Sequence, residues 1–318
     1  LKETFLINLE EGRYKLKKAI TDVPVGINAI LTARIDRLSA ELNEMAQAAS
    51  VLGREFEVQI LLELIRIIRS SAAKDGRKQV KDERLEHILS EGIIERVWNV
   101  LSEIKYIFKH ALLRDAVYEM QLKSRLRSLH KIAGEVMVKL YPEDKTRYSD
   151  IAFHCNKAEQ KEKAKDYYSK AGDYAKEIFE ADPAIDCYNK ALAVCLELFG
   201  EKHPETAQSY TNIGEVYKEK GDYDKAQGYF TKAFAIRIEI LGEKHPNTAE
   251  SYNSMGRVYW NKGEYDKALE YSNKALAIQT EVFGKKHPDT AESYNNIGEV
   301  YEEKGDYDKA LEYSNNAL

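Results

Sequence analysis

Small and apolar residues in the second half of the chain recur at helical spacing. After Pro246 a first stretch places such residues three or four positions apart, at Ala249, Tyr252, Met255, Gly256 and Tyr259. A second stretch repeats the spacing at Ala268, Tyr271, Ala275, Ile278 and Val282. This spacing is typical of an amphipathic helix, with one side against a neighbour and one in water. The pattern therefore predicts two helices that pack together.

The same unit begins again every 42 residues, at Gly200, Gly242 and Gly284. Each copy has a proline where the first helix begins, a position that tolerates a missing N–H. These residues are Pro204, Pro246 and Pro288. Each copy also has a glycine where the first helix must stop and turn, at Gly221, Gly263 and Gly305. Every unit is therefore predicted to be a helix, a tight turn and a second helix.

The unit resembles the tetratricopeptide repeat, with a small residue in its first helix, a tyrosine three positions later and an alanine early in its second. The 42-residue period exceeds the usual ~34 and resembles the variant of kinesin light chains. The aromatic residue that the family has in the second helix is Phe230 here, but the next two units have Ser272 and Ser314. We expect the preceding tyrosines to take over this packing: Tyr229, Tyr271 and Tyr313. Residues 146–318 are therefore predicted to form an α-solenoid, with degenerate units up to residue 199.

Residues 1–145 have a different pattern. A helix pair is predicted in 23–56, with Leu31, Ile35 and Leu38 facing Met45, Ala49 and Leu52. A helix around VQILLELIR, a basic loop and a helix at DERLEHILSEG follow, and then come two short β-rich runs, IIERV and IKYIFKH. Helices followed by a small hairpin suggest a winged-helix-type domain. The whole chain is thus expected to be mainly α.

Spaced blocks in this region resemble the arm that follows the nucleotide-binding core of signal-transduction ATPases with numerous domains. The matching blocks are Pro24 and residues 33–38, 49–56 and 108–119. The resemblance implies that His110 approaches the β-phosphate of bound ADP; the alternative is that His110 only caps or packs at a helix start. No GxxxxGK[ST] phosphate cradle occurs in these residues, so no cofactor and no ATPase activity are expected of them. ADP or ATP would belong to the full-length protein.

Composition and charge narrow the remaining possibilities. A net charge of −5 and a pI near 5.9 argue against nucleic acid as the partner. The predicted recognition helix also sets Lys81 and Arg84 among four acidic residues. Three cysteines without a CxxC motif suggest a reducing, cytoplasmic location, and no apolar run is long enough to span a membrane. No catalytic or metal-ligating constellation stands out. The recurring His203, His245 and His287 are predicted to be structural loop residues.

The first helices of the repeats carry the candidate partner-binding residues, because family register places them on the inner wall of a solenoid. They are Gln208, Thr211, Asn212, Glu215, Lys218, Glu250, Asn253, Ser254, Arg257, Trp260, Glu292, Asn295, Asn296, Glu299 and Glu302. Asparagine offers both a donor and an acceptor to the main chain of an extended peptide. The glutamates favour a basic or polar partner, and Trp260 offers an apolar anchor. The alternative is that these residues are only a hydrated inner surface.

Two functions fit this sequence. The first is the regulatory sensor arm of a signal-transduction ATPase, which binds a protein or peptide through its repeats and shifts the ATPase between closed and open states. In that case oligomerisation would be a property of the full-length protein. The alternative is a stand-alone adaptor or scaffold without nucleotide switching.

Overall fold

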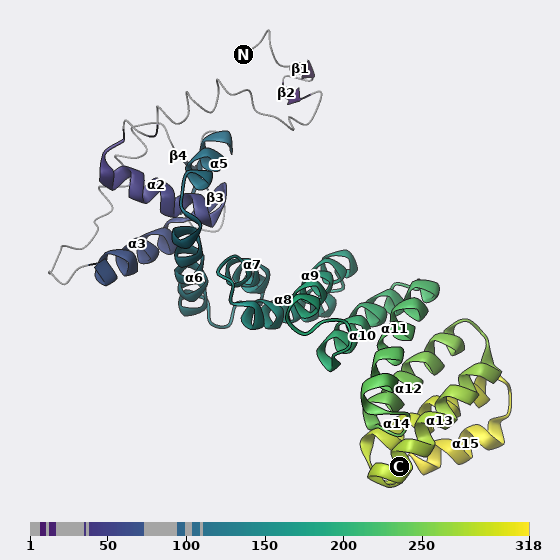
Figure 1. The fold of residues 1–318 in the computed structure, drawn as a ribbon. Helices are drawn as coiled ribbons and strands as arrows, with labels where there is room; N and C mark the ends of the chain where they lie inside the picture. Colours follow the sequence, from purple (N-terminus) through teal and green to yellow (C-terminus); the bar gives the residue numbers. More distant parts are fainter. Residues whose placement is uncertain are drawn as a thin grey trace. The chain divides into compact units, whose positions relative to one another are not determined.

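The computed structural model describes residues 7–10, 13–16, 35, 38–72, 94–98, 104–108 and 111–317 (Figure 1). The described chain is mainly helical, as predicted. It divides into two compact units, Leu1–Val136 and Met137–Leu318. The division falls inside helix α6 (Lys123–Leu140), whereas the sequence places the boundary after residue 145.

The first unit combines helices with short antiparallel strands. Its helices are α2 (Ala40–Leu52), α3 (Val58–Ala72), α5 (Ala111–Glu119) and most of α6. Strands β3 (Glu55–Glu57), β4 (Ile94–Trp98) and β5 (Ile104–Phe108) form a sheet in the order β3-β5-β4. A separate hairpin joins β1 (Ile7–Glu10) to β2 (Arg13–Leu16).

The β4–β5 hairpin was predicted from the sequence, but strands β1, β2 and β3 were not. In the sheet, Tyr106 of β5 pairs with Phe56 on one side and Arg96 on the other. The helix predicted at DERLEHILSEG lies outside the described residues, and so do Leu31 and His110. The winged-helix prediction therefore stays a prediction.

One hydrophobic core holds the first unit together. Helix α2 begins at Ser39, whose hydroxyl accepts from the Leu42 N–H at 3.3 Å and satisfies one donor of the first turn. The side chains predicted to face one another join this core: Ile35, Leu38, Met45, Ala49 and Leu52. The rings of Phe56 and Phe108 meet edge to face with centroids 5.9 Å apart, which ties β3 and β5 to the helices.

The second unit is a run of helices that pair along the chain, shown from teal to yellow in Figure 1. Its helices are the short η1 (Lys145–Arg147), α7 (Tyr148–Lys157), α8 (Lys161–Glu177), α9 (Ala181–Phe199), α10 (Pro204–Glu219), α11 (Tyr223–Leu241), α12 (Pro246–Asn261), α13 (Tyr265–Phe283), α14 (Pro288–Glu303) and α15 (Tyr307–Asn316). The predicted helix–turn–helix repeats are thus confirmed. We call α10, α12 and α14 the A helices, and α11, α13 and α15 the B helices.

The turns between the A and B helices follow the predicted glycine pattern. Gly221, Gly263 and Gly305 have φ values of 80°, 74° and 77°, a left-handed conformation that costs glycine little. In the degenerate unit before them Phe179 occupies the corresponding turn. It has φ 61° and is 94% exposed.

Candidate partner-binding site

Close contact between A and B helices fixes the geometry of each repeat. A Cβ atom built on Gly214 would lie 2.8 Å from the ring of Phe230, and one on Gly256 would lie 2.6 Å from the Ser272 hydroxyl. Real Cβ atoms essentially never show contacts this short. At Gly214 the neighbour is a buried ring, so the helix needs glycine there, whereas at Gly256 the serine hydroxyl can rotate away. The close approach predicted from the small residues is therefore confirmed.

Stacked tyrosines join the two helices in every unit, including the one that has Phe230. The side chain nearest Gly256 is Ser272, so the tyrosines do not take the place of the phenylalanine as expected. A tyrosine of each A helix stacks on a tyrosine of the following B helix, with centroids 5.3–5.5 Å apart. The pairs are Tyr217–Tyr229, Tyr259–Tyr271 and Tyr301–Tyr313. A lysine of each B helix lies over the A-helix ring at 5.0–5.2 Å: Lys225, Lys267 and Lys309. Ring stacking and the cation–π contacts orient the two helices of each repeat.

The recurring histidines begin the A helices. The Nδ1 atoms of His203, His245 and His287 accept from the backbone N–H two residues later, at 3.1–3.2 Å. Each histidine therefore acts as an N-cap, a role usually taken by serine, threonine, asparagine or aspartate. They are structural residues, as expected, and their capping role was not predicted. Within the part of the chain that is described, no three histidine, cysteine or acidic side chains gather as a metal site.

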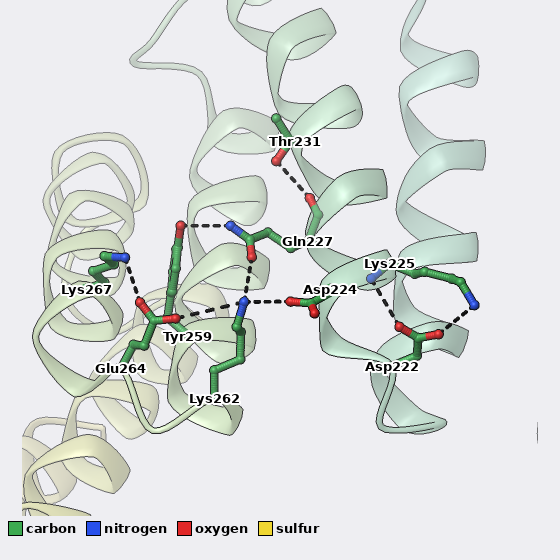
Figure 2. Close-up of polar contacts among 9 residues, drawn as sticks. All are labelled: Asp222, Asp224, Lys225, Gln227, Thr231, Tyr259, Lys262, Glu264 and Lys267. Atoms are coloured by element: carbon green, nitrogen blue, oxygen red, sulfur yellow. Dashed lines mark hydrogen bonds and ion pairs between the residues drawn. The ribbon is translucent and has the colours of Figure 1, made fainter.

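A lysine at the end of each A helix connects successive repeats, and Figure 2 shows the most elaborate case. Lys262 donates to Asp224 at 2.8 Å and to Gln227 at 3.0 Å, both on α11. Gln227 in turn donates to the Tyr259 hydroxyl at 3.0 Å. The hydrogen bond to Asp224 raises the pKa of Lys262.

The same lysine–aspartate bond recurs in the neighbouring repeats, as Lys220–Asp182 and Lys304–Asp266, each at 2.5 Å. The aspartates are 82–92% exposed, and exposed ion pairs contribute little stability. The regular spacing, 38 residues in each case, helps to keep the repeats in register.

Buried polar contacts form a second, less regular connection between successive repeats. A serine of each A helix meets a polar side chain of the helix before it, 14 residues earlier. The pairs are Cys195–Ser209, Arg237–Ser251 and Gln279–Ser293. Sequence reasoning missed these contacts, although the serines recur with the 42-residue period.

Arg237 stands out among these contacts because it is a buried charge, only 3% exposed. Its guanidinium donates to the Ser251 hydroxyl, the Asn247 carbonyl and the Gln208 amide oxygen at 2.9–3.0 Å. Glu250 lies 3.2 Å away as its counter-ion. Burial lowers the pKa of Arg237, and these partners offset the cost of removing the charge from water.

The fifteen candidate residues fall into three groups by exposure. Seven are exposed: Gln208, Glu250, Arg257, Glu292, Asn295, Glu299 and Glu302. Four are half-buried: Asn212, Glu215, Lys218 and Trp260. The remaining four are buried: Thr211, Asn253, Ser254 and Asn296. We call the eleven exposed or half-buried residues the A-helix face.

Two of the buried candidates are engaged within the array. The Thr211 hydroxyl donates to the Ala207 carbonyl at 3.1 Å, within its own helix. The Asn253 amide donates to Ser293 at 2.7 Å, which joins α12 to α14. A ligand would have to break these bonds to use either side chain.

Charge is distributed unevenly over the A-helix face. Glu215 and Lys218 form an ion pair on α10, and Arg257 lies 3.9 Å from Glu292 between α12 and α14. Glu299 and Glu302 have no ion-pair partner among the residues that the structure describes. The α14 end of the face therefore carries uncompensated negative charge.

Two polar atoms close to this face have no hydrogen-bond partner. They are the indole Nε1 of Trp260 on α12 and the amide Nδ2 of Asn296 on α14. Both atoms are donors, and both are removed from solvent. An unpaired buried donor costs about 1–3 kcal/mol. Because both atoms are covered, a ligand would reach them only after the side chains around them move.

Comparison with protein-family models identifies the repeats. Three overlapping segments, 180–239, 210–271 and 247–318, match the tetratricopeptide repeat. This part of the chain therefore consists of tetratricopeptide repeats, which generally mediate protein–protein interaction and typically form a scaffold without catalysis. No curated protein matches the chain.

The chain is similar to many solved structures, two of which are described here. BtubC (BKLC) from P. vanneervenii is 22% identical, with 61% of this chain and 79% of that one covered at a TM-score of 0.49. A kinesin-light-chain-type protein from Podosopora anserina, with nearly identical tetratricopeptide-like repeats, is 19% identical and covers 62% of this chain and 95% of its own at 0.47. None of the helices within the described ranges is long and apolar enough to cross a membrane.

Proposed function

We propose that the A-helix face binds an extended segment of a protein partner. The observation that carries this proposal is the row of exposed polar side chains on successive A helices, among them Gln208, Glu250 and Asn295. The main chain of an extended peptide offers a donor and an acceptor at nearly every residue, which suits exposed side-chain amides such as those of Gln208 and Asn295. The interaction role common to tetratricopeptide repeats supports the same reading.

The partner is proposed to be basic or polar. Glu299 and Glu302 present negative charge without a local counter-ion, while Lys218 is already paired with Glu215. Complementary charge speeds association and selects among partners. Trp260 is half-buried at the edge of a hydrophobic cluster and adds an apolar surface for one side chain of the partner.

We further propose that the chain is the sensor arm of a signal-transduction ATPase. The resemblance rests on the blocks named above, and several of their residues lie in the core of the first unit: Ala49, Val51, Phe56, Phe108 and Leu113. Nucleotide would then be bound by other parts of the protein. The sequence that precedes these residues in the gene tests this assignment: a P-loop followed by a Walker-B strand supports it, and their absence favours the adaptor.

Binding is tested with peptides selected from a random display library on the 318-residue chain. Two variants probe the face: Trp260→Phe, which replaces the indole by a smaller aromatic ring, and Asn212→Ala combined with Asn296→Ala, which removes a half-buried amide of the face and a buried amide on the neighbouring α14. Asn273→Ala is the matched control, because Asn273 is an exposed asparagine on helix α13 that bonds only to its own helix.

Affinity for a selected peptide is expected to fall about 3–10-fold in Trp260→Phe, because the smaller ring loses about 1 kcal/mol of apolar contact. The asparagine double variant is expected to lose more. Asn273→Ala is expected to bind like the unchanged chain, and circular dichroism is expected to show equal helicity throughout. Equal affinity in all variants would place the binding site elsewhere.

A further inference from the structure

Arg237 is buried, yet it contacts side chains of the A-helix face. Its Nη2 atom on α11 donates to the Oε1 atom of Gln208 on α10 at 2.9 Å. Gln208 is exposed, and its Nε2 atom donates to the Oδ1 atom of Asn212, one turn further along α10, at 2.9 Å. These three side chains connect the interior of the array with its surface, and we call them the amide relay.

The chemistry of these groups fixes the direction of both hydrogen bonds. A guanidinium has only donors, so the Gln208 amide can bond to it only through its oxygen. The nitrogen of that amide then faces Asn212, which must accept through its own oxygen. The Nδ2 atom of Asn212 is therefore left to donate to a group outside the amide relay. An asparagine without this constraint could turn either end of its amide outward.

Partners on α12 keep the guanidinium in place. Its Nη1 atom donates to the Ser251 hydroxyl at 2.9 Å and to the Asn247 carbonyl at 3.0 Å. The same atom lies 3.2 Å from a carboxylate oxygen of Glu250. Because these partners hold Nη1, Nη2 stays directed at Gln208. Glu250 is exposed, so the same guanidinium also fixes an acceptor on α12.

The next repeat has the same register but cannot form an amide relay. Gln279 takes the place of Arg237, and its amide oxygen accepts from the Ser293 hydroxyl. Glu250 takes the place of Gln208, and a carboxylate has no N–H to donate to the next side chain. The fixed amide orientation is therefore specific to α10 and does not follow from the repeat as such.

We infer that Arg237 is a positioning residue of the A-helix face, which makes Asn212 a donor to the bound partner and not an acceptor. This inference rests on the proposed function, because it assigns the polarity of that same site. The partner must place an oxygen acceptor at Asn212 and an N–H or ammonium group at Glu250. Arg237 acts through the amide relay and does not itself contact the partner.

NMR of the side-chain amides in the free 318-residue chain tests the amide relay without any peptide. The bond to Asn212 is expected to slow the hydrogen exchange of one Gln208 amide proton. Arg237→Gln supplies an amide with both a donor and an acceptor, so it no longer fixes Gln208, and this exchange is expected to become about threefold faster. Gln227 is the internal reference, because a lysine holds its oxygen and a tyrosine hydroxyl accepts from its nitrogen, and its exchange is expected to stay unchanged. Equal exchange of the Gln208 amide in both chains would overturn the inference.

The affinity for a peptide selected on the chain tests the link to binding. Arg237→Gln is expected to lower this affinity about 3–10-fold, because the peptide must then order the Gln208 and Asn212 side chains itself. Asn212→Ala removes the donor and is expected to lower the affinity at least as much. When both changes are combined, the loss is expected to equal that of Asn212→Ala within about twofold, because the amide through which Arg237 acts is already gone. Asn273→Ala serves again as the control and is expected to leave the affinity unchanged.

Losses that multiply in the combined variant would give Arg237 a general structural role and overturn the inference. Should Arg237→Gln lose helicity by circular dichroism, Gln208→Leu takes its place in the affinity measurements, because this exposed substitution breaks the amide relay without removing the buried charge. If no peptide can be selected, the proposed function fails, while the exchange of the Gln208 amide still decides whether Arg237 orients the relay.

Discussion

The close contact between A and B helices can be tested with a matched pair of glycine substitutions in one repeat. Gly214 lies in α10, where an added Cβ would be 2.8, 2.9 and 3.1 Å from three atoms of the Phe230 ring. Phe230 is 1% exposed, so the ring cannot move out of the way. Gly228 lies within α11, and an added Cβ there has no neighbour within 4 Å.

Both changes to alanine gain helix propensity of about 1 kcal/mol, but only Gly214→Ala overpacks the helix contact, at a cost of about 1–3 kcal/mol. Gly228→Ala is therefore expected to raise the free energy of unfolding by about 1 kcal/mol. The free energy of unfolding of Gly214→Ala is expected to be about 1–3 kcal/mol lower than that of Gly228→Ala. Urea unfolding followed by circular dichroism measures both. Equal stabilisation of the two variants would refute the close packing of α10 on α11.

Three further predictions concern stability and pH. Burial lowers the pKa of His154 to about 4, whereas the same side chain in the unfolded chain takes up its proton near pH 6.5. The contribution of the buried neutral ring to stability is therefore complete above about pH 6.5 and falls by about 3 kcal/mol towards pH 4. The fall is expected to be smaller in His154→Gln, measured by urea unfolding against pH. Phe179→Gly is expected to stabilise the chain by about 0.5–1 kcal/mol, because relief of the left-handed backbone outweighs the flexibility of glycine; a lower thermal midpoint would contradict this. Arg237→Gln, which copies Gln279, is expected to stay within about 1 kcal/mol of the unchanged chain, since it removes a desolvated charge and can keep the bond to Ser251; a loss above 3 kcal/mol would show that the charge itself is required.

The repeat fold could be predicted from the sequence because each unit carries its own local signals. Proline at the first turn, glycine at the turn between helices and spaced small residues all act within about 20 positions of one another. Repetition then confirms each signal three times. In the first unit the signals are weaker, and strand β3 was missed because three residues, Glu55–Glu57, carry no pattern of their own.

The candidate face was harder to predict, because exposure depends on neighbours that are distant in sequence. Asn253 and Asn295 occupy the same position in successive repeats, yet Asn253 is buried against Ser293 while Asn295 is exposed. The hydrogen-bond partners of Arg237 come from α10 and α12, so no local sequence pattern around residue 237 predicts them. The register of the repeat identifies the A helices. It does not show which of their side chains already form hydrogen bonds within the array.

Trp260 provides the most direct measurement of the central claim that the A-helix face binds a partner. The chain has two tryptophans, and Trp98→Phe leaves Trp260 as the only one. Titrating this variant with a selected peptide is expected to shift or quench the emission of Trp260, with a midpoint that matches the Kd from calorimetry. Binding by calorimetry without any change in Trp260 emission would contradict the claim.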